Sequence, residues 1–383
     1  MINNGRGIKF SWHNIVIMLV IFTFNFNMKM SGQANDEIVM ISISNSGSFV
    51  AIATNNGEVK ILNTSTIQII NSIPGLFGIV TQIAWSNNDA FIALGASENN
   101  SKNGKVYIFD ATTGNTIRVF SDLEGTIYSL AWNTEHTQVL IGSEMIDGGE
   151  TIIGEVASGF SSQISPGPAT SIKISPDQSQ FAFGNIVGKI RIVNSITLST
   201  EVLSNTNISS GQPVMRLHWS STQPFIASGH LDGMIVVWNT QSGTILHTLS
   251  AAAAIGMDAE YSQMVLALAF DSTGIRLRSF NREGRIRVWD TQTWALIAEQ
   301  IVPGPIYAAD WDKTGTTLYY GTDSAIPRVV RAPDLPPLPT PTALPHPIFP
   351  PPGGGQPACP DGTGGEWMWV DGELIFVCGV NWE

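Results

Sequence analysis

The stretch that decides the fold is Gln212–Ser250, QPVMRLHWSSTQPFIASGHLDGMIVVWNTQSGTILHTLS. It holds four short apolar runs, VMRLHW, FIASG, MIVVW and ILHTL, each of strand length. The segments between them, SSTQP, HLDG and NTQSG, are rich in the residues that favour turns. The stretch therefore predicts a four-stranded antiparallel meander.

The same frame recurs seven times along the chain. In each unit an apolar anchor at the end of the first predicted strand is followed by Ser, Asn or Asp, and a second apolar residue stands seven positions later. Units of about 40–50 residues with four strands are typical of propeller blades. We therefore expect an all-β, seven-bladed propeller of four-stranded antiparallel blades over residues 36–332. The anchors are Ile43, Trp85, Trp132, Ile174, Trp219, Phe270 and Trp311, and their partners are Val50, Ile92, Val139, Phe181, Ile226, Leu277 and Leu318.

The units resemble the repeats of the WD-repeat family. The similarity is clearest in Gly233–Gly243, Gly284–Asp290 and Gly104–Gly114, and Ile174-Ser-Pro-Asp177 matches the turn after the first strand of a repeat. The resemblance covers roughly residues 36–333. It implies a seven-bladed β-propeller that serves as an interaction platform, usually without catalysis.

Blades of this family often carry a hydrogen-bonded set of His, Ser or Thr, Asp and Trp. No Gly-His pair precedes the first strand of the fifth unit, and four other units have Leu62, Phe109, Gly154 or Val193 at the Trp position. We interpret the residues that match this set as structural. They are Ser228, Asp232 and Trp238 in the fifth unit and Ser279, Glu283 and Trp289 in the sixth.

The seventh unit supplies only three predicted strands, Ile306–Trp311, Thr317–Gly321 and Arg328–Arg331. An open sheet edge invites unwanted pairing, so a propeller is expected to complete its last blade with a strand from the other terminus. Phe22–Met30 alternates apolar and polar residues, which is a strand period. This segment is suited to the vacant position.

The N-terminal residues 1–34 also resemble a secretory signal peptide. Arg6 and Lys9 precede the apolar run Ile15–Phe22, and small residues lead to a possible cleavage site after Ala34. We expect an extracytoplasmic protein, whether secreted, periplasmic or on the cell surface. The alternative is an uncleaved anchor that attaches the chain to a membrane through residues 15–26. Cleavage after Ala34 would remove Phe22–Met30, so export and ring closure by this segment conflict.

The C-terminal part is expected to be separate from the propeller. Residues 333–357 are rich in proline and predict an extended spacer. Residues 358–383 predict a small hairpin around Asp371-Gly372, with Trp369 opposite Leu374 and Trp367 opposite Phe376. A disulfide between Cys359 and Cys378 is expected, because so small a unit buries little apolar area unaided.

Composition and motifs exclude several classes of function. The 383 residues carry a formal net charge of -12, which argues against nucleic acid as a partner. The six histidines show no metal-site spacing, and no nucleophile elbow or phosphate-binding loop is present. We therefore predict a protein that is not an enzyme and has no catalytic residue, metal site or cofactor.

The expected function is a non-enzymatic scaffold that presents loops to a protein or peptide partner. Five arginines of the sixth unit form either a solvated surface or a docking patch for an acidic partner, namely Arg276, Arg278, Arg282, Arg285 and Arg287. Two alternatives stay open. Trp367 and Trp369 could form a carbohydrate-binding platform on a cell-surface protein, or the central channel could hold an active site.

Overall fold

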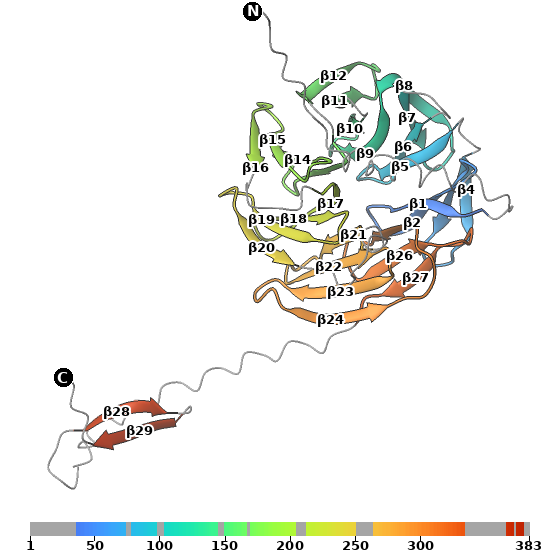
Figure 1. The fold of residues 1–383 in the computed structure, drawn as a ribbon. Helices are drawn as coiled ribbons and strands as arrows, with labels where there is room; N and C mark the ends of the chain where they lie inside the picture. The colour runs from blue at the N-terminus through green and yellow to red at the C-terminus, as the bar shows by residue number, and fades with distance from the viewer. Residues whose placement is uncertain are drawn as a thin grey trace, which may run out of the picture. The chain divides into compact units, whose positions relative to one another are not determined.

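Each expected repeat forms its own antiparallel sheet, and seven such sheets are arranged as a ring (Figure 1). The computed structural model describes residues 36–73, 78–97, 103–144, 149–166, 169–203, 212–249, 263–333, 365–370 and 373–378. All regular elements in these ranges are strands. No helix long and apolar enough to cross a membrane occurs in the same ranges. The expected seven-bladed, all-β propeller is confirmed.

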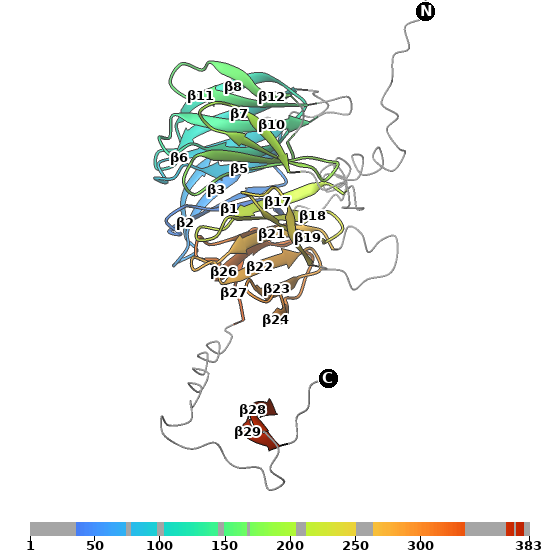
Figure 2. The same cartoon turned by 90° about the vertical axis from the view of Figure 1, so that its left-hand side faces the viewer.

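The first four blades each contain four strands, numbered in chain order from the inside of the ring outward. The first strand of each blade lies nearest the centre, and Figure 2 shows the sheets from the side. The strands are β1 (Ile38–Ile43), β2 (Phe49–Thr54), β3 (Val59–Asn63) and β4 (Ile69–Ile73); β5 (Ile79–Trp85), β6 (Phe91–Ser97), β7 (Asn103–Asp110) and β8 (Thr116–Glu124); β9 (Thr126–Trp132), β10 (Gln138–Glu144), β11 (Glu150–Glu155) and β12 (Ser161–Pro166); β13 (Ser171–Ile174), β14 (Gln180–Gly184), β15 (Ile190–Asn194) and β16 (Thr200–Leu203).

The fifth and sixth blades follow the same order, whereas the described part of the seventh has three strands. The strands are β17 (Val214–Trp219), β18 (Phe225–His230), β19 (Ile235–Asn239) and β20 (Ile245–Leu249); β21 (Val265–Phe270), β22 (Arg276–Asn281), β23 (Arg285–Asp290) and β24 (Leu296–Ile301); β25 (Ala308–Trp311), β26 (Thr317–Gly321) and β27 (Arg328–Arg331).

The predicted anchors fix the register of every blade. All seven are the last residues of the innermost strands, and each is paired directly with the apolar residue seven positions later. The pairs are Ile43–Val50, Trp85–Ile92, Trp132–Val139, Ile174–Phe181, Trp219–Ile226, Phe270–Leu277 and Trp311–Leu318. The interval of seven therefore reflects a turn of five residues between the first two strands, the same length in every blade.

The hydrophobic core is divided among the boundaries between blades. Seven clusters of buried residues occur, and each combines side chains of two neighbouring sheets. Neighbouring residues of one strand contribute to different clusters, as Ile38 and Val39 do in β1, because successive side chains point to opposite faces. Both faces of a blade are buried, so no blade could bury its apolar surface alone.

The first and seventh blades contact each other and close the ring. Ile38 donates its backbone N–H to the carbonyl of Thr322 at 3.3 Å, and one core cluster joins residues of these two blades. The outer strand β27 differs from the third strands of the other blades, since Val329 is 45% exposed whereas Val236 and Val237 of β19 are fully buried. A fourth strand covers β19, but none covers β27 within the described ranges.

A separate unit at the C-terminus contains the two-stranded sheet β28 (Gly365–Val370) and β29 (Glu373–Cys378). Its backbone register pairs Trp369 with Leu374 and Trp367 with Phe376, as expected. Other expectations concern residues outside the described ranges: the signal peptide or anchor of residues 1–34, the strand Phe22–Met30, nearly all of the spacer 333–357, and Cys359 of the expected disulfide.

Candidate functional site

The five arginines of the sixth blade do not form one surface. Arg278 is paired with Val288, whereas Arg287 is paired with Ser279. Paired residues of an antiparallel sheet share a face, so Arg276 and Arg278 lie on one face of the blade and Arg285 and Arg287 on the other. Arg278 and Arg287 are also buried, at 4% and 6% exposure. The pleat of the sheet therefore separates arginines that are close together in the sequence and places them on opposite faces of the blade.

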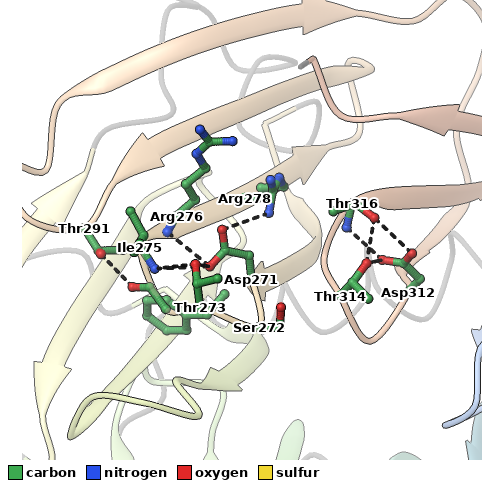
Figure 3. Close-up of polar contacts among 12 residues, drawn as sticks. Asp271, Ser272, Thr273, Ile275, Arg276, Arg278, Thr291, Asp312, Thr314 and Thr316 are labelled. Atoms are coloured by element: carbon green, nitrogen blue, oxygen red, sulfur yellow. Dashed lines mark hydrogen bonds and ion pairs between the residues drawn. The ribbon is translucent and has the colours of Figure 1, made fainter. Parts of the chain in front are cut away.

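Acidic neighbours balance most of these arginines. Arg285 contacts Glu299 at 2.8 Å and Glu283 at 3.2 Å, and Arg287 contacts Glu299 at 2.6 Å. Arg278 lies 3.7 Å from Asp271 (Figure 3). Hydrogen bonding to Arg287, with its positive charge, holds the pKa of Glu299 below its ordinary value. These contacts agree better with a neutralised structural cluster than with a patch that attracts an acidic partner.

A buried hydrogen-bond network in the fifth blade corresponds in part to the expected family set. Trp238 donates from Nε1 to the Ser228 hydroxyl at 3.2 Å, and this hydroxyl lies 3.0 Å from Nε2 of His230. The other ring nitrogen of His230 lies 3.1 Å from the carbonyl of Gln212. Asp232 instead accepts the backbone N–H of Met234 in a turn.

His230 is the member of this network that the sequence pattern did not identify. The pattern required a Gly-His pair before the first strand, whereas Gly229-His230 ends the second strand. Alternation along β18 could have found it, because residues two apart in a strand point to the same face.

The sixth blade does not reproduce the network. Ser279 and Trp289 are buried, but Nε1 of Trp289 has no hydrogen-bond partner in the described part of the chain. Glu283 accepts hydrogen bonds from Gln263 and Arg285. Trp367 and Trp369 lie on β28, where the structure describes the backbone but not the side chains.

One face of the ring, which we call the turn face, is built from the turns between the first and second strands. In every blade the side chain that follows the anchor accepts backbone N–H groups of its own turn, which rigidifies the turn. Figure 3 shows Asp271 and Asp312 in this role. The seven residues are Ser44, Ser86, Asn133, Ser175, Ser220, Asp271 and Asp312.

A cavity of about 350 Å³ lies in the central channel and begins at the turn face. It is lined by innermost strands and by the turn residues Asn45, Asn87 and Gln178. Three charged side chains of different blades line it as well, Lys173 of β13, Arg216 of β17 and Asp310 of β25. The cavity thus brings together charged residues that are far apart in the sequence.

Arg216 and Asp310 are held in place by the neighbouring blades. Arg216 donates from Nε to the carbonyl of Leu266 at 2.7 Å and from Nη1 to its neighbour Met215 at 2.7 Å. Asp310 accepts the backbone N–H of Ile43 at 3.0 Å. Lys173 is exposed to the cavity, and its ammonium makes no hydrogen bond or ion pair within the described ranges.

Burial shifts the pKa values of this cluster. Desolvation raises the pKa of Asp310, although Lys173 and Arg216 act in the opposite direction. Desolvation also lowers the pKa of Arg216. His218 lies on β17 itself, two residues after Arg216, and has its pKa lowered to about 3, chiefly by burial and secondly by the charge of Lys173. No cluster of His, Cys, Asp and Glu suited to a metal ion occurs among the described residues.

Sequence comparison identifies one repeat directly. The family described as WD domain, G-beta repeat, matches residues 203–239, which include the first three strands of the fifth blade. No curated protein matches the chain.

Proposed function

Because this chain is a WD-repeat β-propeller, we propose that it is an extracytoplasmic, non-enzymatic scaffold that holds a protein or peptide partner on the turn face. Propellers of this family generally serve as protein-interaction scaffolds. The observation that carries the choice of face is the recurrence of self-capped turns in all seven blades. Such preformed turns lose little conformational freedom on binding, which favours affinity.

The central cavity supports the same face. It opens among the turns, and its lining comes from several blades, so one partner can contact several repeats at once. Binding sites in proteins are commonly concave and carry a few placed polar groups. The cavity combines these properties with a rigid rim.

Site-specific cross-linking tests the proposed face. Lys313 and Lys189 are both exposed, in the turn between β25 and β26 and in the turn between β14 and β15, at opposite ends of the strands. A photoreactive residue at Lys313 should capture the partner from the native source, whereas the same residue at Lys189 should not. Capture from Lys189 alone would contradict the proposal. Equal capture from Lys313, from Lys189 and from the unfolded chain would also contradict it, because the capture would then not depend on the face.

Export of the chain is the second part of the proposal, supported by the signal-like residues 1–34. N-terminal sequencing of the protein from its native source tests it. A mature chain that begins near Asn35 in an extracytoplasmic fraction would agree with the proposal. An intact Met1 in a reducing compartment would oppose it.

A further inference from the structure

The charge of the central cavity is opposite to that of the whole protein. The chain carries a formal net charge of -12, yet the charged side chains that line the cavity are two cations, Lys173 and Arg216, and one carboxylate, Asp310. A local excess of positive charge in a concave, partly desolvated place attracts an anionic group.

The donors in the cavity are incompletely used. Arg216 donates hydrogen bonds from Nε and Nη1 to backbone carbonyls. Its Nη2 makes no hydrogen bond within the described ranges. The Lys173 ammonium is likewise without an acceptor there. Carboxylates accept charge-assisted hydrogen bonds from both groups. An incoming carboxylate would therefore supply the acceptors that the protein itself does not provide.

The size of the cavity restricts the ligand. At about 350 Å³ it lies near the lower end of the range for ligand pockets, roughly 300–1,000 Å³, so it can take one acidic side chain and water but no long segment. Nδ2 of Asn45 donates to the carbonyl and Oδ1 of Asn87 at the rim, and Nε2 of Gln178 donates to the carbonyl of Ser175. Nδ2 of Asn87 is the amide donor left to bind the backbone beside such a residue. Because the whole protein is acidic, a partner with basic residues around a single acid fits best.

We propose that the channel mouth binds the carboxylate of one Asp or Glu side chain of the peptide or protein partner, between Lys173 and Arg216. The proposal rests on the scaffold function proposed above and names the chemical group that the turn face recognises. Asp310 lies beside the bound carboxylate and weakens its binding through like-charge repulsion.

Two matched peptides test the proposal by calorimetry with the full chain at pH 7. The probes are acetyl-Lys-Gly-Glu-Gly-Lys-amide and the same peptide with Gln in place of Glu. The Glu peptide should bind at least tenfold more tightly, and addition of salt should reduce this difference. Equal binding of the two peptides would overturn the proposal.

Three variants with opposite expected signs localise the effect. Lys173→Gln should weaken binding of the Glu peptide at least tenfold, whereas Asp310→Asn, which removes the repulsion and keeps an acceptor for Ile43, should strengthen it several-fold. Lys313→Gln removes an exposed lysine of the same face outside the cavity lining and should leave binding unchanged. If Lys313→Gln weakened binding as much as Lys173→Gln, the effect would come from the whole face and the cavity proposal would fail.

Succinate distinguishes a free small acid from a peptide side chain. The Glu peptide should bind more tightly than succinate, because the rim amide of Asn87 contacts only the peptide. If succinate bound as tightly as the peptide, the cavity would be a small-acid site and the proposal would be wrong. Cross-linking from Lys313 that persists in the Lys173→Gln variant would also refute it, while the scaffold function would stand.

Discussion

Nδ1 of His218 accepts the backbone N–H of Phe270 at 3.2 Å, which joins the innermost strand of the fifth blade to that of the sixth. Asp310 holds the equivalent position in the seventh blade, one residue before the anchor, and accepts the N–H of the anchor Ile43 in the first blade. The same contact therefore recurs at two boundaries with different side chains. In both cases the acceptor must be unprotonated at the atom that receives the hydrogen bond.

The contact between His218 and Phe270 predicts sensitivity to acid. The pKa of His218 is lowered to about 3 in the folded protein, mainly by burial, so below pH 6.5 the unfolded chain binds a proton that the folded chain does not. Stability from this group is complete above pH 6.5 and falls as the pH drops toward 3. His218→Asn keeps an acceptor near the position of Nδ1 and should lose less stability between pH 7 and pH 4.5 than the native protein, as measured by urea unfolding.

A packing variant provides the control. Phe270→Leu removes the ring that lies 6.1 Å from the imidazole but keeps His218, so it should lower stability equally at both pH values. An unchanged acid sensitivity in His218→Asn would contradict the assignment.

The network of the fifth blade predicts that Ser228→Ala lowers the free energy of unfolding more than Ser279→Ala does. The hydroxyl of Ser228 accepts from Trp238 and contacts His230 in a fully buried place, so its loss leaves polar groups without partners. The cost should be about 1–3 kcal/mol of unfolding free energy. Ser279 makes no such contact with Trp289 and is the matched control in the sixth blade. Thermal and urea unfolding measure both variants. If Ser228→Ala and Ser279→Ala lost the same unfolding free energy, the result would argue against the network.

The close packing of blades predicts that Gly229→Ala is destabilising. A Cβ atom at Gly229 would lie 2.5 Å from Cγ1 of Val265, on the first strand of the next blade. Overpacking of this kind typically costs about 1–3 kcal/mol. Combining Gly229→Ala with Val265→Ala should cost less than the sum of the two single variants. Strict additivity in a double-mutant cycle would show that the two residues do not press on each other.

A left-handed turn residue offers a stabilising substitution. Leu198 has a φ angle of 54° in the turn between β15 and β16, where the fifth blade has Gly243 with a φ angle of 69°. The left-handed conformation costs a residue with a side chain roughly 1–2 kcal/mol, and glycine gives back roughly 0.5–1 kcal/mol in chain entropy. Leu198→Gly should therefore raise the unfolding free energy by about 0.5–1 kcal/mol. Leu198→Ala keeps the strain and should not, and a gain in both variants would point to the lost apolar surface instead.

Closure of the seventh blade by Phe22–Met30 is the alternative to the proposed cleavage after Ala34, and the exposed third strand of that blade allows the two to be distinguished. Removing residues 1–34 deletes Phe22–Met30, the segment expected to cover β27, whereas removing residues 1–20 keeps it. If Phe22–Met30 completes the blade, the longer deletion should lower the unfolding free energy by on the order of 2 kcal/mol and promote self-association at the free edge; if the exported chain begins near Asn35, the two chains should behave alike. Urea unfolding and sedimentation compare the two chains. Equal stability and equal monomer content would show that this segment does not complete the blade.

Periodicity made the blades predictable, because each blade is a local unit whose strands and turns follow one another along the chain. The anchors and the residues seven positions later emerged with the correct register for this reason. The arginine cluster shows where such reasoning stops. Arg278 and Arg287 belong to the same cluster of arginines in the sequence. The pleat and the pairing of β22 with β23 nevertheless place them on opposite faces of the blade.

The sequence by itself determined the number of blades, the strand that begins each of them and the turn that follows each anchor, since these depend on residues within one repeat. Only the tertiary structure decided that Lys173, Arg216 and Asp310 share one cavity, because three separate repeats contribute them and nothing local marks their relation. Closure of the ring brings the innermost strands together around one axis. The channel and its charge therefore exist only in the complete ring.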